Sequence, residues 1–145
     1  MTGVLVDTSV VLKWFHESGE DQVEEARALL DAHQDDVLPA YVLDLSVYEL
    51  GNVLLRSLGW SADDVADQVD DLIAICGPPL VPDPRSRRRA AELGERHKLS
   101  YYDAVFAATA QVRGFPLVTA DRRLLDSGLG ESPAELVRRL VDSPG

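Results

Sequence analysis

The sequence predicts an α/β domain with a mainly parallel β-sheet and helices on both faces of that sheet. Two observations predict this fold class. Short apolar runs, too brief for helices and suited to buried strands, alternate with longer segments of helical periodicity. Such alternation favours βαβ units, in which the crossover helices cover the sheet. The length of 145 residues suits one domain, 1–145, with a core of ordinary size.

The first predicted element is a strand at 3–6 that ends in Asp7. Thr8 and Ser9 are suitable helix-cap residues, and a helix at 10–15 follows them. The first strand of an α/β domain usually lies near the middle of the sheet, which places Asp7 at the carboxyl end of a central strand. A carboxylate there costs free energy unless it is paired or coordinated. Asp7 is therefore a candidate functional residue.

The following segments contain a second candidate acid, Glu49. They are predicted as a helix at 20–33, a strand at 37–40 and a helix at 44–58 that Gly59 closes. Leu45 and Val53 lie one helical turn to either side of Glu49, so its carboxylate lies on or beside the apolar stripe. Glutamate is seldom buried without a partner, so an inward Glu49 indicates a cation or another polar group. The alternative is a structural glutamate at the edge of the stripe.

The middle of the chain is predicted as scaffold. Ser61 caps a helix at 62–75, whose outer face is acidic (Asp63, Asp64, Asp67, Asp70 and Asp71). The Gly-Pro-Pro break at 77–79 follows, then a minimal strand at 80–81 and a basic helix at 85–97.

The stretch 99–125 contains the other two candidate acids. Ser100 is a suitable cap for a helix at 101–113, which puts Asp103 in the first turn. A short strand at 116–119 follows, and Asp121 lies just past its end. Taken alone, Asp103 also fits a capping box and Asp121 a solvated turn. The C-terminal part is predicted as a loop at 127–130 and a helix at 133–141.

Charge is unevenly distributed along the chain. The formal net charge is −11, but residues 1–84 carry −14 whereas residues 85–145 carry +3. The candidate residues for contacting nucleic-acid phosphates in the basic part are Arg87, Arg88, Arg89 and Arg122. The alternative for such a cluster is a solvated helix face.

The N-terminus has no basic region and reaches Asp7 after a few apolar residues. The sequence therefore predicts neither a signal peptide nor a membrane span, and we expect a cytoplasmic protein with no membrane partner. The single cysteine, Cys76, excludes an internal disulfide.

The four acids Asp7, Glu49, Asp103 and Asp121 form a candidate cluster at strand ends and inward helix faces. Bare carboxylates brought together repel one another, and a bound divalent cation removes that cost. Oxygen ligands suit Mg²⁺ or Mn²⁺, and such ions support phosphodiester hydrolysis. The hydroxyls of Ser9 and Thr119 are candidates for holding the carboxylates in place.

Other chemistries lack their motifs. The sequence has no Gly-rich phosphate loop and no Gly-x-Ser-x-Gly elbow, and the three histidines lack metal-ligand spacing. A phosphatase-like domain that forms an aspartyl phosphate needs a second aspartate two residues after Asp7, where this chain has Ser9. An RNA-binding module that keeps the acids but does not cleave efficiently remains the main alternative to a nuclease.

Four segments together resemble the acid-bearing motifs of the PIN-domain ribonucleases, and most of all the VapC toxins. They are VLVDTSVVLKWFHE at 4–17, YELGNVL at 48–54, LSYYDAVFAATA at 99–110 and LVTADRRLL at 117–125. The resemblance implies a Rossmann-like PIN fold and a Mg²⁺-dependent endoribonuclease site at Asp7, Glu49, Asp103 and Asp121. It also implies RNA substrates such as tRNA or rRNA, a homodimer, and neutralisation by a cognate antitoxin.

Overall fold

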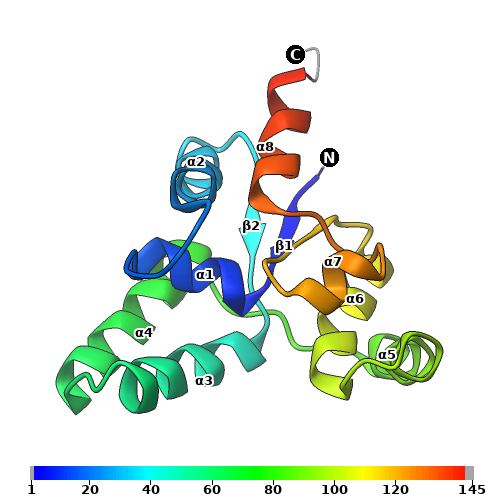
Figure 1. Ribbon diagram of the computed structural model, residues 1–145, viewed down its shortest axis with the longest axis horizontal. Helices are drawn as coiled ribbons and strands as arrows, with labels where there is room; N and C mark the ends of the chain where they lie inside the picture. The colour runs from blue at the N-terminus through cyan, green and yellow to red at the C-terminus, as the bar shows by residue number, and fades with distance from the viewer. Residues whose placement is uncertain (1, 143–145) are drawn as a thin grey trace.

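A three-stranded parallel sheet forms the centre of the molecule, with the strand order β2-β1-β3. The computed structural model describes residues 2–142 (Figure 1). The strands are β1 (Val4–Val6), β2 (Ala40–Tyr41) and β3 (Leu117–Val118). In the register of the sheet, Val4 pairs with Ala40 and Leu5 pairs with Leu117. The predicted parallel sheet with a central first strand is confirmed.

Helices connect the strands and make up most of the chain. They are α1 (Thr8–Phe15), α2 (Val23–Gln34), α3 (Asp44–Asn52), the π-helical segment η1 (Val53–Ser57), α4 (Ala62–Cys76), α5 (Pro84–His97), α6 (Tyr101–Arg113), α7 (Arg122–Asp126) and α8 (Pro133–Asp142). The predicted caps Ser61 and Ser100 both accept a hydrogen bond from the backbone N–H three residues on. No helix within residues 2–142 is long and apolar enough to cross a membrane.

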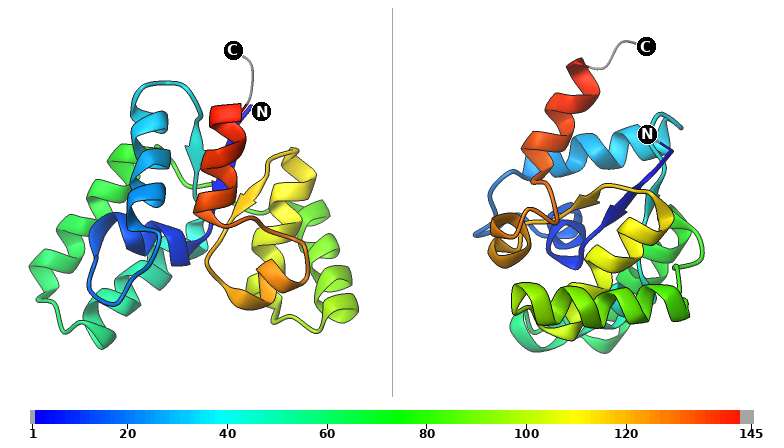
Figure 2. Two further views of the ribbon diagram at one scale, coloured as in Figure 1. Left: turned by 45° about the horizontal axis from the view of Figure 1, so that its top comes forward. Right: turned by 90° about the vertical axis from the view of Figure 1, so that its right-hand side faces the viewer.

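The two faces of the sheet are covered by different helices. Because side chains alternate along a strand, Val4 and Val6 of β1 pack into one hydrophobic core and Leu5 into another. The first core includes buried residues of α1, α2, α3, α4 and α8, and the second those of α5, α6 and α7. Figure 2 shows the two groups of helices diverging on either side of the strands. The prediction of helices on both faces is confirmed.

The second strand lies later than predicted. It begins at Ala40, whereas the sequence pattern predicts 37–40. The N–H groups of Val37 and Leu38 both donate to the Ala32 carbonyl at the end of α2, and Pro39 has no N–H. Val37 and Leu38 therefore close a helix instead of pairing with β1, and the first contact with β1 is made by the Pro39 carbonyl, which accepts from the Val4 N–H at 2.9 Å. The strand predicted at 80–81 is reduced to an isolated parallel bridge between Leu43 and Leu80.

Two helices also differ from the predictions. The helix predicted at 44–58 changes to π-helical hydrogen bonding from Val53 onward. The short helix α7 was not predicted, and it forms because the Asp121 carboxylate accepts hydrogen bonds from the Arg123 and Leu124 N–H groups. Capping of this kind offsets the unpaired N–H groups of a first turn.

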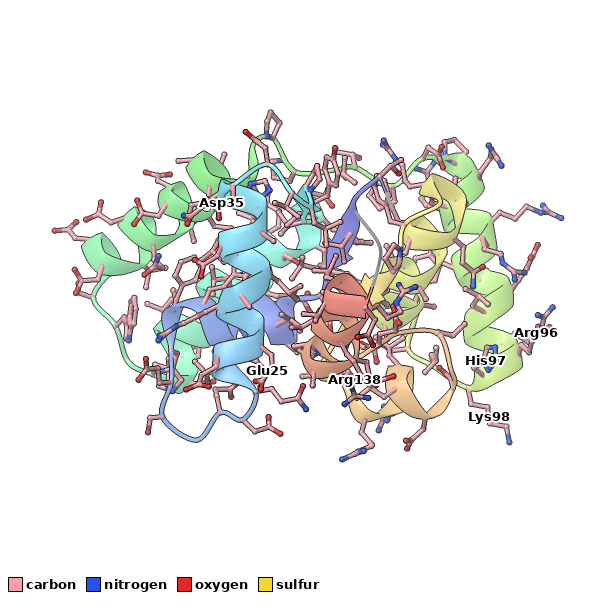
Figure 3. The ribbon with its side chains drawn as sticks, turned by 90° about the horizontal axis from the view of Figure 1, so that it is seen from above. Glu25, Asp35, Arg96, His97, Lys98 and Arg138 are labelled. Atoms are coloured by element: carbon pink, nitrogen blue, oxygen red, sulfur yellow. The ribbon has the colours of Figure 1, made fainter. Side chains whose placement is uncertain are left out.

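The acidic part of the sequence and the basic part lie on different sides of the folded molecule. Figure 3 shows Glu25 on α2 and Asp35 just past its end and, on the other side of the molecule, Arg96 and His97 at the end of α5 with Lys98 directly after it. One cation of the acidic part, Lys13, is buried, and it binds Glu20 at 3.1 Å and Asp21 at 3.0 Å. This cluster holds the loop between α1 and α2 against the end of α1.

Candidate functional site

The candidate site lies at the carboxyl ends of β1 and β3. β2 lies on one side of β1 and β3 lies on the other. The connections from β1 therefore run in opposite directions along the sheet, which makes β1 a topological switch point. Crevices at such a switch point are the usual ligand sites of open α/β sheets. Asp7 directly follows β1, and Thr119 and Asp121 follow β3 (Figure 1).

Asp7 is buried, with 7% of its surface exposed, and is held by three donors. Its Oδ1 accepts a hydrogen bond from the Thr8 N–H at 2.9 Å, and its Oδ2 accepts from the hydroxyls of Ser9 and Thr119, each at 2.7 Å. Burial raises the pKa of Asp7; the three donors offset part of that rise, and the negative charge of Asp103 adds to it. Asp7 is also the N-cap of α1, a role that the sequence pattern assigns to Thr8 and Ser9.

The same two hydroxyls tie the ends of the strands together. While donating to Asp7, the Thr119 hydroxyl accepts from the Asp121 N–H at 3.0 Å, and the Ser9 hydroxyl accepts from the Ala120 N–H at 2.9 Å. Thr119 is fully buried. Ser9 and Thr119, which sequence reasoning proposes as supports, thus both contact the Asp7 carboxylate and fix the backbone that leads to Asp121.

Glu49 reaches the site from α3 and is half-buried. The Thr8 hydroxyl donates to its Oε1 at 2.7 Å, and the Ser46 hydroxyl lies 2.8 Å from the Thr8 hydroxyl. Because the Thr8 proton goes to Glu49, Ser46 is the donor of the second bond. Burial raises the pKa of Glu49, the hydrogen bond from Thr8 offsets part of that rise, and the negative charges of Asp7 and Asp103 add to it.

Sequence reasoning missed Thr8 and Ser46 as site residues. A signal was present for Ser46, which precedes Glu49 by three residues and therefore shares its helix face. Thr8 was treated only as a cap. Its contact with Glu49 depends on the packing of α1 against α3, which the sequence pattern does not specify.

Asp103 and Asp121 form the other side of the site. Asp103 lies in the first turn of α6, where its N–H donates to the Ser100 hydroxyl at 3.1 Å. Its pKa is raised by burial and by the charge of Asp121, and Ser100 and Arg123 lower it in part. Asp121 uses Oδ1 to cap α7, and within residues 2–142 its Oδ2 has no hydrogen-bond partner. One oxygen of Asp121 is thus fixed while the other is available.

The four acids influence one another electrostatically. Asp7, Glu49 and Asp103 all have raised pKa values, and each receives part of that rise from another member of the set. No group of three or more His, Cys, Asp or Glu side chains in residues 2–142 is arranged to hold a metal ion. The donor set, all carboxylates and hydroxyls, fits a hard divalent cation in its chemistry.

Comparison with known proteins identifies the family. The sequence model of the PIN domain family matches residues 4–127. This chain belongs to the PIN domain family. Among curated proteins, none matches the sequence significantly.

Solved structures share the PIN fold at low sequence identity. A Pyrobaculum aerophilum protein, PAE2754, is 23% identical with a TM-score of 0.69, and the match covers 98% of this chain and 91% of that one. A chain from a toxin–antitoxin complex of Klebsiella pneumoniae is 19% identical with a TM-score of 0.67, covering 90% and 98% of the two chains. A FitAcB chain from Neisseria gonorrhoeae has the same identity, TM-score and coverages.

The predicted RNA-contacting arginines of this PIN domain lie in two places. Arg87, Arg88 and Arg89 are in the first half of α5, where Arg89 donates to Gln111 near the end of α6. Gln111 is eight residues from Asp103, about 12 Å along the helix. Arg122 lies near Asp21. The pKa of Asp21 is lowered mainly by its contact with Lys13, and the charge of Arg122 lowers it a little further. Arg123, which was not among the candidates, acts electrostatically on Asp103.

Proposed function

We propose that this PIN domain is a Mg²⁺- or Mn²⁺-dependent endoribonuclease with Asp7, Glu49, Asp103 and Asp121 as the metal ligands. One observation carries the proposal. Four acids from four separate segments lie near the switch point of the sheet and act on one another electrostatically, and three of them have raised pKa values, caused by burial and increased by the negative charge of their neighbours. A protein that buries repelling carboxylates loses stability unless a cation binds them. PIN domains are generally nucleases, and the family membership makes hydrolysis of phosphodiester bonds the expected chemistry.

Hydrogen bonds within the site orient the carboxylates that would hold the cation. A divalent cation, when bound, polarises the phosphoryl group and lowers the pKa of the attacking water. Asp7 supplies a carboxylate in a fixed orientation because Ser9 and Thr119 both donate to its Oδ2. Thr8 orients Glu49 in the same manner. Asp121 presents Oδ2 while its Oδ1 is held by α7. These hydrogen bonds reduce the reorganisation that binding a cation and a phosphate would require.

We further propose that the enzyme is a VapC-type toxin that acts in the cytoplasm on tRNA or rRNA, as a homodimer, and is neutralised by a cognate antitoxin. The support is the motif pattern together with the likeness in fold to a chain solved in a toxin–antitoxin complex. The basic residues of α5 and α7 would contact RNA phosphates, beside a site whose own acids repel them.

The test is cleavage of a panel of tRNAs and rRNA fragments by the purified, antitoxin-free protein with Mg²⁺, with Mn²⁺ and with EDTA. Asp103→Asn is the site variant. Asp67→Asn on the exposed face of α4 is the matched control. We expect discrete metal-dependent cuts that Asp103→Asn loses and Asp67→Asn retains. Specific RNA binding without cuts in any condition would instead identify a binding module, and cuts that persist in EDTA would contradict a metal site.

A further inference from the structure

The segment that follows α7 folds back onto the end of β3. The Glu131 N–H donates to the Leu117 carbonyl at 2.8 Å, and the Thr119 N–H donates to the Glu131 carbonyl at 2.9 Å. Glu131 thereby forms an isolated parallel bridge with Val118. The loop that carries Asp121 and α7 therefore begins and ends at the same point of the sheet, beside Thr119.

Gly130 lies where this loop closes, and the packing there leaves no room for a side chain. A methyl group at this position would lie 2.6 Å from Cγ2 of Thr119, 3.4 Å from the carbonyl oxygen of Leu117 and 3.5 Å from Leu117 Cδ2. Carbon atoms that are not bonded to each other pack at about 3.5–4.0 Å, so the contact with Thr119 would force a shift. The φ of Gly130 lies outside the left-handed region, so the constraint on this residue comes from packing and not from backbone conformation.

Thr119 cannot make room for a methyl group without moving its hydroxyl. Its side chain is fully buried, and Cγ2 and Oγ1 are attached to the same Cβ, so a rotation that carries one atom away also carries the other. The hydroxyl donates to Asp7 Oδ2 at 2.7 Å and accepts from the Asp121 N–H at 3.0 Å. Moving Gly130 away instead would break the two backbone hydrogen bonds of Glu131, the next residue. We therefore expect a methyl group at 130 to displace the Thr119 hydroxyl.

We propose that Gly130 is a positioning residue for the candidate site. Because Gly130 has no side chain, the Thr119 methyl group lies against it, in the orientation that directs the Thr119 hydroxyl to both Asp7 and Asp121. This inference rests on the proposed metal-dependent function, in which those two acids are ligands from separate strands. Groups that orient metal ligands by hydrogen bonds typically contribute about 10–100-fold to metal affinity.

The test exchanges the two methyl groups that compete for this space. Gly130→Ala adds a methyl group against Thr119, Thr119→Ser removes the Thr119 methyl group but keeps the hydroxyl, and the double variant does both. Gly51→Ala on α3 is the matched control, because a methyl group there lies 3.9 Å from its nearest neighbours, Val65 and Val69.

Two quantities are measured with the full chain of each variant. Mn²⁺ affinity is obtained from the electron paramagnetic resonance signal of free Mn²⁺. Hydrogen exchange in EDTA reports on the Asp121 N–H, which donates to the Thr119 hydroxyl. The reference amide is the Asp7 N–H, which donates to the Val118 carbonyl in the sheet and does not depend on that hydroxyl.

We expect Gly130→Ala to weaken Mn²⁺ binding about 10-fold or more and to speed exchange of the Asp121 N–H, while the Asp7 N–H keeps its wild-type rate. Gly51→Ala and Thr119→Ser should stay close to the wild type in both measurements. The double variant should return to the values of Thr119→Ser, because the new methyl group occupies the space that the threonine methyl group has left. If Gly130→Ala does not fold, a folded double variant that binds Mn²⁺ gives the same support.

Wild-type Mn²⁺ affinity and Asp121 exchange in Gly130→Ala would overturn the inference. A double variant as impaired as Gly130→Ala would also overturn it, because Gly130 would then be required for the path of the loop and not for the orientation of Thr119. A wild-type protein that binds no Mn²⁺ overturns the proposed function itself, and the role of Gly130 at a metal site with it, whatever the exchange rates are.

Discussion

Replacing Thr119 with valine tests whether the hydrogen bonds around Asp7 stabilise the fold. Valine has nearly the shape of threonine but no hydroxyl, so Thr119→Val removes a donor to Asp7 Oδ2 and an acceptor for the Asp121 N–H. Thr119 is fully buried, so water does not replace the lost partner. A hydrogen bond to a charged group contributes about 1.5–3 kcal/mol, so we expect a loss of about 2–3 kcal/mol of unfolding free energy.

The chain contains a matched control in Thr109 on α6. Its exposed fraction is 1%, close to that of Thr119, but within residues 2–142 its hydroxyl has no hydrogen-bond partner. Thr109→Val therefore makes the same chemical change without breaking a bond. Because an unpaired buried hydroxyl costs about 1–3 kcal/mol, we expect this variant to be as stable as the wild type or more stable by about 1 kcal/mol.

Urea denaturation at pH 7 in EDTA measures both variants against the wild type. The expected difference of about 3 kcal/mol between the two valine variants corresponds to midpoints about 1–3 M apart, for an ordinary denaturant slope. Equal losses in the two variants would show that the hydroxyl of Thr119 contributes no more than its volume. In that case the hydrogen bonds around Asp7 would not be a source of stability, and the reasoning would be refuted.

Three further predictions concern the charges of the site. The pKa values of Asp7, Glu49 and Asp103 are raised in the folded protein, so the unfolded chain releases these protons at lower pH than the folded chain does. The metal-free fold should therefore lose stability as the pH rises from about 4 through the raised pKa values. Urea midpoints measured as a function of pH test this loss of stability. Asp103→Asn should be more stable than the wild type at pH 7 in EDTA and equally stable near pH 3. In a thermal melt, added Mg²⁺ should stabilise this variant less than it stabilises the wild type. A variant less stable than the wild type at pH 7 would contradict charge repulsion at this position. Thr8→Val should raise the Mg²⁺ concentration for half-maximal cleavage several-fold, because Glu49 loses its donor, whereas Thr8→Ser should not, and equal effects of the two would point to packing.

Local sequence patterns predicted the parts of this structure that local forces determine. The cap of α6 by Ser100 and the position of Asp7 at the end of a strand follow from a few neighbouring residues. The alternation of strand-length and helix-length segments was enough for the parallel sheet, because burial on both faces imposes that pattern.

Contacts between distant segments were not predictable in the same way. The hydrogen bond from Thr8 to Glu49 joins residues 41 positions apart, and it exists only because α1 packs against α3. The late start of β2 has a similar cause, since Val37 and Leu38 find a better acceptor in α2 than in β1. The distance from Arg89 to Asp103 depends on the pairing of α5 with α6, which composition alone does not reveal.

Two of the four acids also cap helices, and this second role limits which residues can replace them as the family diverges. Asp7 is the N-cap of α1 and Asp121 is the N-cap of α7, whereas Glu49 and Asp103 cap nothing. A descendant without the proposed nuclease activity would be free to replace Glu49 and Asp103, but it would still need Asp, Asn or Ser at 7 and 121 to begin those helices. Retention of the capping pair without the other two would then be the sequence mark of a PIN domain that has become a scaffold.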